Sequence, residues 1–308
     1  MKTLFVERTM ARKIGVALAG AATLMSAGIL MEGTATAVGI ADTKHNLSSP
    51  AGIGATATFT PTAGSGELCV FCHTPHGANI SAVVPLWNRA MADPATYTTY
   101  NSLGTTSLDG ATAPVGSVSL ACLSCHDGTV AMNVMINQPG SGGYNPAGAA
   151  WAGTWAGTGQ TAGVLGTPTS ITRIGQDLRN DHPIGIQYGG GMPAGGAYTQ
   201  ADIAAGTLKD PDFKGLKFAS LNSQPTWWVD SGTVTGTRDK ADMVLYTRTG
   251  ADSVTYPGGV RTVTAGALTG AQAFVECASC HDPHTSAQPT FLRMSNAGSS
   301  LCLACHIK

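Results

Sequence analysis

The chain has 308 residues, a formal net charge of −1 and 11% charged residues, against 43% hydrophobic residues. Globular proteins carry about 25% charged residues, so the charged fraction of this chain is low. Either much of its surface is buried against other subunits, or it is a secreted protein whose surface is rich in glycine, threonine, serine and alanine. The nearly neutral charge balance gives no support for a nucleic-acid partner.

Residues 1–37 have the pattern of a secretory signal. Lysine or arginine occurs at positions 2, 8, 12 and 13, an apolar run extends from Ile14 to Met31, and Ala35-Thr36-Ala37 provides small residues for cleavage. The rest of the chain has no further apolar run long enough to span a bilayer. We expect an exported protein without a membrane span in its mature form, extracellular or at the cell surface, or alternatively periplasmic. An uncleaved membrane anchor is the other interpretation of this segment.

All eight cysteines belong to four C-x-x-C-H runs. A disulfide framework or zinc sites would explain paired cysteines, but neither explains a histidine directly after every pair. C-x-x-C-H is the attachment signature of c-type haem, in which the two sulfurs bond the vinyl groups and the histidine becomes the proximal iron ligand. We therefore predict four covalently attached haem c groups. The attachment residues are Cys69, Cys72, Cys122, Cys125, Cys277, Cys280, Cys302 and Cys305, and the proximal ligands are His73, His126, His281 and His306.

Four further histidines are available for four irons that each have one open axial position. Methionine is the rival ligand and would raise the reduction potential relative to histidine. Because the histidines suffice, we interpret the methionines beyond the signal as packing residues and predict that most of the haems are bis-histidine. The predicted distal ligands are His45, His76, His182 and His284.

The stretch CVFCHTPH at 69–76 places a second histidine three residues after the first. Axial ligands approach a flat haem from opposite faces, and three residues cannot carry the chain around its rim. Pro75 also biases the preceding residue away from helical backbone. We therefore predict that His76 ligates a neighbouring haem, and that His284, in the similar stretch CASCHDPH at 277–284, does the same.

The motifs divide the chain beyond the signal into three segments. Residues 38–130 carry an N-terminal haem pair, residues 131–273 form a glycine-rich spacer that supplies one distal histidine, and residues 274–308 carry a C-terminal doubled motif. Each haem pair opens with C-x-x-C-H-x-P-H and closes with a plain C-x-x-C-H.

We expect a mainly irregular fold with short α-helices at the haem motifs. Alternating apolar and polar residues in DMVLYTR and SVTYPGGVRTVT predict a small β-hairpin around Pro257-Gly258-Gly259. Glycine-rich stretches elsewhere in the spacer break helices and strands, so covalently attached haems would supply much of the core. Trp151 and Trp155 either shield a haem from solvent or contact another subunit, or they are ordinary packing residues.

The stretch VECASCHDPH, followed by FLRMSNAGSSLCLACH, resembles the doubled CxxCH module of bacterial multihaem cytochromes c. With CVFCHTPH and KHNLS, the chain is similar to the extracellular tetrahaem cytochromes of metal-reducing bacteria, including those that polymerise into conductive filaments. The resemblance covers residues 44–128 and 274–307. It implies a multihaem cytochrome c architecture organised around four stacked haems, and in some members an axial histidine from the adjacent subunit. His45 is our candidate for that histidine.

These patterns favour a tetrahaem electron carrier, not an enzyme, as the leading function hypothesis, because eight ligands leave no iron open to substrate. Its expected partners are redox proteins or extracellular electron acceptors, and other copies of the chain in a homopolymer. The low charge favours assembly, because transient redox partners steer one another with charged rims. The alternatives are a soluble periplasmic electron shuttle, a multihaem reductase of a small oxyanion and a membrane-anchored quinol dehydrogenase.

Overall fold

The chain divides into two units, residues 1–37 and 38–308, and only the second is described below. The predicted secretory signal lies outside the described residues. No helix in the described part of the chain is long and apolar enough to cross a membrane. The computed structural model describes residues 39–48, 55–63, 66–80, 84–140, 143–191, 208–232, 237–248, 253–255, 262–264 and 272–307.

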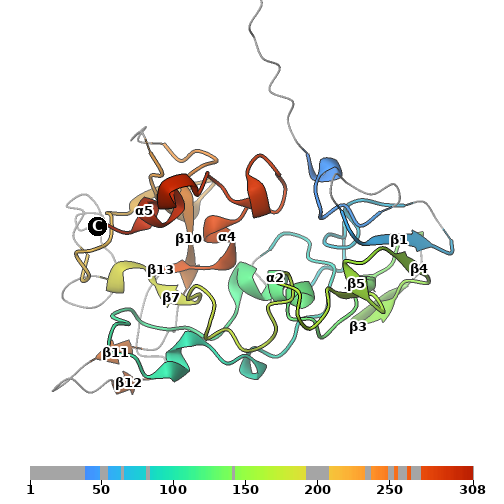
Figure 1. The fold of residues 1–308 in the computed structure, drawn as a ribbon, viewed down its shortest axis with the longest axis horizontal. Helices are drawn as coiled ribbons and strands as arrows, with labels where there is room; N and C mark the ends of the chain where they lie inside the picture. Colours follow the sequence, from blue (N-terminus) through green and yellow to red (C-terminus); the bar gives the residue numbers. More distant parts are fainter. Residues whose placement is uncertain are drawn as a thin grey trace, which may run out of the picture. The chain divides into compact units, whose positions relative to one another are not determined.

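A five-stranded antiparallel sheet supports the C-terminal half of the second unit (Figure 1). Its strand order is β7-β13-β10-β9-β8, so the strand that leads into the third motif is paired on both sides. The hairpin between β8 and β9 turns at Asn222 and Ser223, both with positive φ, which is the backbone of a two-residue hairpin turn. The strands are β7 (Ile186–Gln187), β8 (Lys217–Leu221), β9 (Gln224–Val229), β10 (Met243–Arg248) and β13 (Gln272–Val275).

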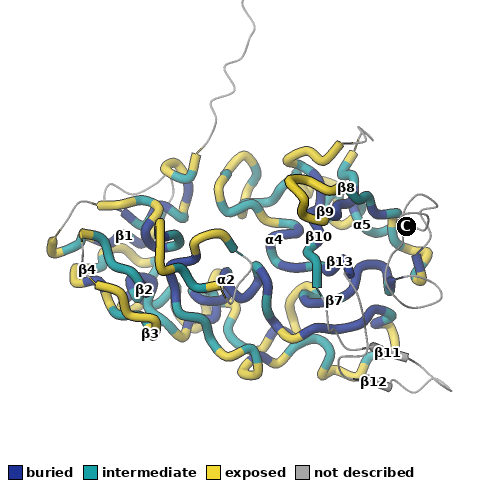
Figure 2. Tube along the Cα trace, turned by 180° about the vertical axis from the view of Figure 1, so that it is seen from behind, coloured by how far each residue is buried: buried dark blue, intermediate teal, exposed yellow. Residues whose placement is uncertain are grey.

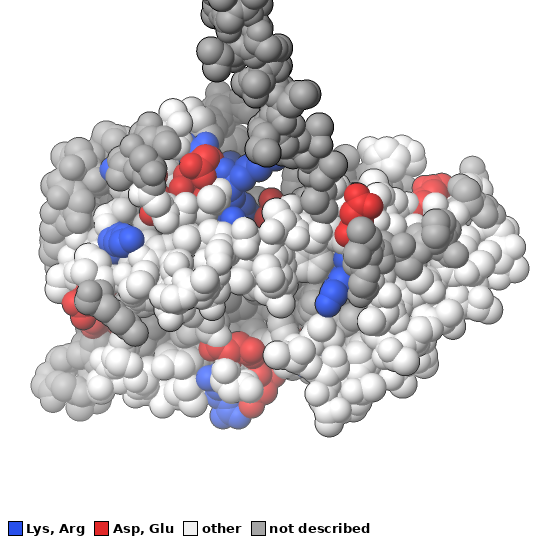
Figure 3. All heavy atoms as spheres, turned by 45° about the horizontal axis from the view of Figure 1, so that its top comes forward, with Lys and Arg blue, Asp and Glu red and all other residues white. Residues whose placement is uncertain are grey.

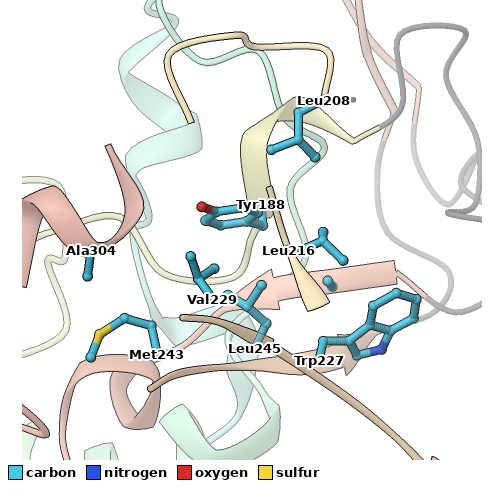
Figure 4. Packing of buried hydrophobic residues seen from close by; sticks show 9 residues of the cluster. Tyr188, Leu208, Leu216, Trp227, Val229, Met243, Leu245 and Ala304 are labelled. Atoms are coloured by element: carbon cyan, nitrogen blue, oxygen red, sulfur yellow. The ribbon is translucent and has the colours of Figure 1, made fainter. Parts of the chain in front are cut away.

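The main apolar core lies against this sheet. Side chains alternate between the faces of a strand, so Trp227 and Val229 of β9 and Met243 and Leu245 of β10 contribute to one cluster (Figure 4). Ala304 of α5 (Ser300–Cys305) packs into the same cluster. The sheet therefore provides the support for the fourth C-x-x-C-H motif.

The other half of the unit is built from two-stranded ribbons around an aromatic cluster. Phe59 packs against Phe71, Trp151 and Trp155, with ring centroids 5.0 to 6.0 Å apart. Both tryptophans therefore have ordinary packing roles here. The ribbons pair β1 (Thr58–Pro61) with β4 (Gly153–Ala156), β2 (Val134–Asn137) with β3 (Tyr144–Ala150), and β5 (Gln160–Thr161) with β6 (Val164–Leu165).

Helices are short and coincide with the motifs. They are α2 (Ser117–His126), α4 (Cys277–Cys280) and α5, and α2 packs against α4. Figure 2 shows buried chain along α2, β10 and β13, whereas β3 and β4 are largely exposed. The 3-10 segments are η1 (Ile40–Asp42), η2 (Pro94–Thr96), η3 (Tyr100–Leu103), η4 (Tyr188–Gly190), η6 (Pro289–Phe291) and η7 (Ala297–Ser299).

The strands differ in part from those expected from the sequence. An antiparallel pair, β11 (Ser253–Thr255) with β12 (Thr262–Thr264), occurs where the hairpin is predicted. Its expected turn at 257–259 lies outside the described residues. The stretch before it, β10, instead joins the five-stranded sheet, which the alternation does not predict. Tertiary burial explains the difference, because apolar runs such as Trp227-Trp228-Val229 are buried on both faces and do not alternate.

Candidate haem centres

Each C-x-x-C-H motif forms a single turn, which is helical in the second, third and fourth motifs. The backbone N–H of the histidine donates to the carbonyl of the first cysteine in the first, third and fourth motifs, at 2.8, 3.2 and 2.9 Å, and α2 contains the second. Residues at i, i+3 and i+4 share one face of a helix. The two sulfurs and the imidazole of each motif therefore lie on a common face, as a group attached through all three requires. All eight cysteines are unpaired.

Cysteines of successive motifs are neighbours. The Cys122 thiol, in the second motif, is hydrogen-bonded to Cys277 of the third, and this contact is the main cause that raises the pKa of Cys122. Between the first and second motifs, burial raises the pKa of the Cys72 thiol to about 12, and the charge of Cys125 adds to the rise. These sulfurs therefore lie close enough to interact.

The third and fourth motifs are joined in the same way. Burial raises the pKa of the Cys305 thiol to about 12, and the charge of Cys280 adds to the rise. Each motif therefore lies within electrostatic range of the next motif along the chain.

Three proximal histidines are anchored through Nδ1 to backbone carbonyls. His73 donates to Pro85 at 2.8 Å, His126 to Thr172 at 2.8 Å and His281 to Thr290 at 2.9 Å. A carbonyl only accepts, so Nδ1 carries the proton and the lone pair is on Nε2. This is the hydrogen bond by which metal-binding imidazoles are usually oriented. These residues fit an iron ligated through Nε2.

Two distal histidines lie opposite proximal histidines within the chain. The ring centroids of His45 and His126 are 6.3 Å apart, with planes at 82°. Those of His73 and His284 are 6.1 Å apart, with planes at 18°. Two imidazoles bound to one metal from opposite sides, each through a bond of about 2 Å, have centroids roughly 6 Å apart. The spacing in both pairs fits axial ligation of one iron.

The surroundings of His45 keep its imidazole neutral. Burial lowers the pKa of His45 to about 4, although its hydrogen bond to the Pro283 carbonyl, at 3.1 Å, opposes the shift. Its ring also stacks on Phe291 with centroids 4.2 Å apart. Neutral imidazole is the form that binds metal, so this environment suits a ligand.

His182 lies near the fourth proximal histidine. Desolvation lowers the pKa of His182, and the charge of His306 lowers it further. Nδ1 of His182 is 3.1 Å from the Pro183 carbonyl, which leaves Nε2 available. His306 is positioned by a bridge to Phe213, whose ring lies 4.4 Å from the imidazole.

His76 and His281 make no ring contact with a second histidine among the residues that the structure describes. Burial lowers the pKa of both His45 and His126, however, and the charge of His281 contributes to the shift. Both His76 and His281 are exposed. The Asn137 amide nitrogen lies 3.3 Å from His76 Nδ1 and donates to the His76 carbonyl at 3.0 Å. His45, our candidate for an intersubunit ligand, instead lies beside His126 of its own chain, so His76 takes its place in that hypothesis.

Trp87 is a site residue that the sequence did not single out. Its indole N–H is buried without a hydrogen-bond partner, and its ring lies 5.9 Å from that of His73 in an edge-on arrangement. A buried donor without a partner is uncommon and calls for a ligand or water. The carboxylate substituents of haem would accept from such a donor, which supports the fit of the first site.

Arg248 and Glu276 form a second feature that no motif reveals. Arg248 Nη1 is 2.7 Å from Glu276 Oε1, and Ser119 donates to Glu276 at 2.5 Å and accepts from the Cys277 backbone N–H. Glu276 is 1% exposed and caps α4. This network fixes the start of the third motif against α2. In the sequence, Glu276 is distinguished only by its position directly before Cys277.

The comparisons with known proteins bear on the C-terminal motifs. Residues 271–308 match the family model described as the doubled CXXCH motif. No curated protein matches the chain. Among the described residues, no group of three or more histidine, cysteine, aspartate or glutamate side chains could hold a bare metal ion. The family match, together with the turn geometry of the motifs, indicates covalently bound c-type haem and is consistent with a cytochrome c that transfers electrons.

Proposed function

We propose that the chain is a tetrahaem c-type cytochrome that carries electrons outside the cytoplasm as a repeating subunit of a filament. Bound haem c would supply a one-electron ferric/ferrous couple. The observation that carries the proposal is the closeness of the motifs: α2, with the second motif, packs against α4, with the third, and His284 beside the third motif lies 6.1 Å from His73 of the first. Close spacing between haems is what electron transfer from one to the next requires.

The chain's own residues would hold each haem by two thioether bonds and orient its proximal imidazole. The backbone carbonyls of Pro85, Thr172 and Thr290 fix three of these rings. His45 and His284 would close the second axial positions at His126 and His73. Closed axial positions exclude substrates from iron, which favours electron transfer over chemistry on a bound molecule.

Self-association is supported by two exposed histidines that make no ring contact with another histidine among the described residues. These histidines are His76 and His281. A second copy of the chain would satisfy both if His76 of one copy ligated the haem at His281 of the next. Ile80 and Tyr144, at 92% and 60% exposure, add apolar surface on chain segments near His76.

The surface charge is consistent with assembly. Figure 3 shows acidic and basic side chains in a few separate groups on a largely uncharged face. Long-range steering of a transient partner relies on a field from many like charges, and such a field is not visible on this face.

The test is to purify the exported protein and examine it by negative-stain electron microscopy and electron paramagnetic resonance. We expect filaments in which every ferric haem is low-spin. In a His76→Ala variant we expect monomers in which the haem at His281 is high-spin. Monomeric wild-type protein with four low-spin haems would refute the filament, and would favour the soluble shuttle.

One observation favours a reductase of a small oxyanion as a second candidate. If His281 has no second histidine in the working protein, the iron at that motif keeps an open axial position where a substrate can bind. A high-spin ferric signal in the wild-type protein, combined with turnover of nitrite or hydroxylamine, would support this alternative.

A further inference from the structure

Arg89 is a fully buried cation. The residue is 1% exposed, and all five of its guanidinium N–H groups have acceptors. Nε donates to Ser124 Oγ at 3.2 Å, and the two terminal nitrogens donate to four backbone carbonyls at 2.8 to 3.1 Å. These carbonyls belong to Ser124, Ala131, Met132 and Val134.

Every one of these acceptors is neutral. Arginine stays protonated in proteins, so the charge remains without a carboxylate partner among the described residues. Two other arginines differ, because Arg248 is paired with Glu276 at 2.7 Å and Arg179 with Asp177 at 2.6 Å on the surface. Neutral dipoles solvate the charge of Arg89 without cancelling its long-range field.

Arg89 lies between the first and second attachment motifs. Ser124, which accepts two of its hydrogen bonds, belongs to the second motif and directly precedes Cys125. Asn88, next to Arg89 in the chain, holds the first motif directly, because its backbone N–H donates to the Cys72 carbonyl at 2.8 Å.

The second motif has a compensating charge that the first lacks. Asp127 directly follows His126, is 2% exposed and accepts a hydrogen bond from the Tyr97 hydroxyl at 2.8 Å. The field of Arg89 should therefore be partly cancelled at the second motif and act most strongly at the first.

We propose that Arg89 is a fixed buried charge that gives the haem at the first motif the highest reduction potential of the four. This inference rests on the proposed function. Reduction by a one-electron donor adds one electron to the ferric centre and lowers its charge by one, so a nearby fixed cation stabilises the reduced form. The added electron would rest preferentially at the haem of the first motif.

The size of the effect follows from Coulomb's law. A unit charge roughly 10 Å away, at an effective dielectric constant of about 20, changes the equilibrium constant for reduction by about tenfold or slightly more. For one electron, a tenfold change is about 59 mV. The expected shift is therefore large enough to resolve in a potentiometric titration.

The test is a redox titration of the holoprotein followed by electron paramagnetic resonance. The imidazole planes differ by 18° at His73 and His284 and by 82° at His45 and His126. Near-parallel and near-perpendicular axial imidazoles give distinct low-spin ferric signals, so the first and second haems can be followed separately. In Arg89→Gln we expect the near-parallel signal to disappear at a potential lower by about 59 mV, a tenfold change.

Arg293→Gln is the matched control. Arg293 also donates to backbone carbonyls inside a motif, from its side chain to Ala278 at 3.0 Å and from its backbone N–H to Cys280 at 2.9 Å. It is only partly buried, so water screens its charge. We expect a smaller shift than in Arg89→Gln, confined to the third haem. An equal or larger shift in this control, or no shift in Arg89→Gln, would overturn the inference.

Loss of hydrogen bonds is separated from loss of charge by Arg89→Lys, which keeps the cation. We expect its potential to stay closer to that of the wild type than the potential of Arg89→Gln. If neither variant accumulates with haem, the wild-type titration decides, because the near-parallel signal must be the first to disappear as the potential is lowered. Wild-type protein without low-spin haems would contradict the proposed function itself, whereas low-spin haems with an unshifted variant contradict only the role of Arg89.

Discussion

His76 and His284 occupy the same place in two copies of C-x-x-C-H-x-P-H, yet the structure treats them differently. His284 reaches the proximal histidine of the other copy, with its ring centroid 6.1 Å from that of His73. His76 has no histidine ring beside it among the described residues, and its loop is instead tied to Asn137. The two copies therefore share the backbone turn of the attachment motif and differ in the surroundings of their second histidine.

The difference shows which residues of the motif are positioned by the motif's own backbone and which depend on tertiary packing. The helical turn fixes two cysteines and the first histidine on one face, because spacings of three and four residues suffice for that. The second histidine projects away from this turn, and its partner depends on which element packs nearby. One copy finds that partner within the chain, whereas we propose that the histidine of the other binds a neighbouring copy.

The largest expected effect is that of His284→Ala. This change removes the second ligand of the haem at His73, so we expect one haem in four to become high-spin or to bind an exogenous ligand such as carbon monoxide when reduced. Electron paramagnetic resonance and ligand-binding spectra measure the change. Asp282→Ala is the control, because it alters the same loop and keeps the histidine. A change at the haem of His281 instead would contradict the pairing.

His76→Ala should leave the monomer's haems at His73 and His126 unchanged. Its effect should appear only on assembly, as loss of filaments and as a high-spin haem at His281. Electron microscopy and the spin state are measured on the same preparation. Normal filaments with four low-spin haems would show that His76 is not an intersubunit ligand.

Glu276→Gln tests another difference between the copies, because the residue before the motif is Leu68 in one and Glu276 in the other. Removing one partner of a buried ion pair should lower the free energy of unfolding by roughly 3 kcal/mol. Burial raises the pKa of Glu276 from its ordinary value of 4.5, so the folded state binds this proton more tightly than the unfolded chain. This contribution to stability is complete below pH 4.5 and is lost as the pH rises through the pKa of Glu276 in the folded state.

The variant should lack this pH-dependent contribution. Urea denaturation of wild type and Glu276→Gln at a series of pH values, followed by circular dichroism, measures it. If the two curves of unfolding free energy against pH stay parallel, Glu276 does not titrate as described.

The smallest expected effect is that of Asn137→Ala. The Asn137 amide donates to Thr74 Oγ1 at 2.8 Å and to the His76 carbonyl at 3.0 Å, and the loop is partly exposed. We expect a loss of about 1 kcal/mol in stability and faster hydrogen exchange confined to the loop of His76. Equal acceleration in the loop of His284 would indicate a global effect and contradict the assignment.

The attachment residues could be predicted from the sequence because the chemistry is encoded within five consecutive positions. The distal assignments could not, since His45 and His126 are 81 residues apart and meet only through tertiary packing. His45 illustrates why sequence alone does not assign the distal ligands. Its position soon after the predicted signal favours an intersubunit role, whereas its contacts with Phe291 and Pro283 hold it against its own chain.

The five-stranded sheet was also beyond sequence patterns. Its strands come from segments separated by up to about ninety residues, and β9 and β10 contain buried apolar runs without strict alternation. Arg89 carries no sequence signal at all, because its role depends on burial among carbonyls rather than on a motif.

The account depends most directly on one covalently attached haem at each of the four motifs. Intact mass spectrometry of the exported protein tests this without assuming any ligand pairing. We predict a single species whose mass equals that of the mature chain plus four haems. A species with fewer than four haems, or one whose mass reveals disulfide bonds between the cysteines, would contradict it.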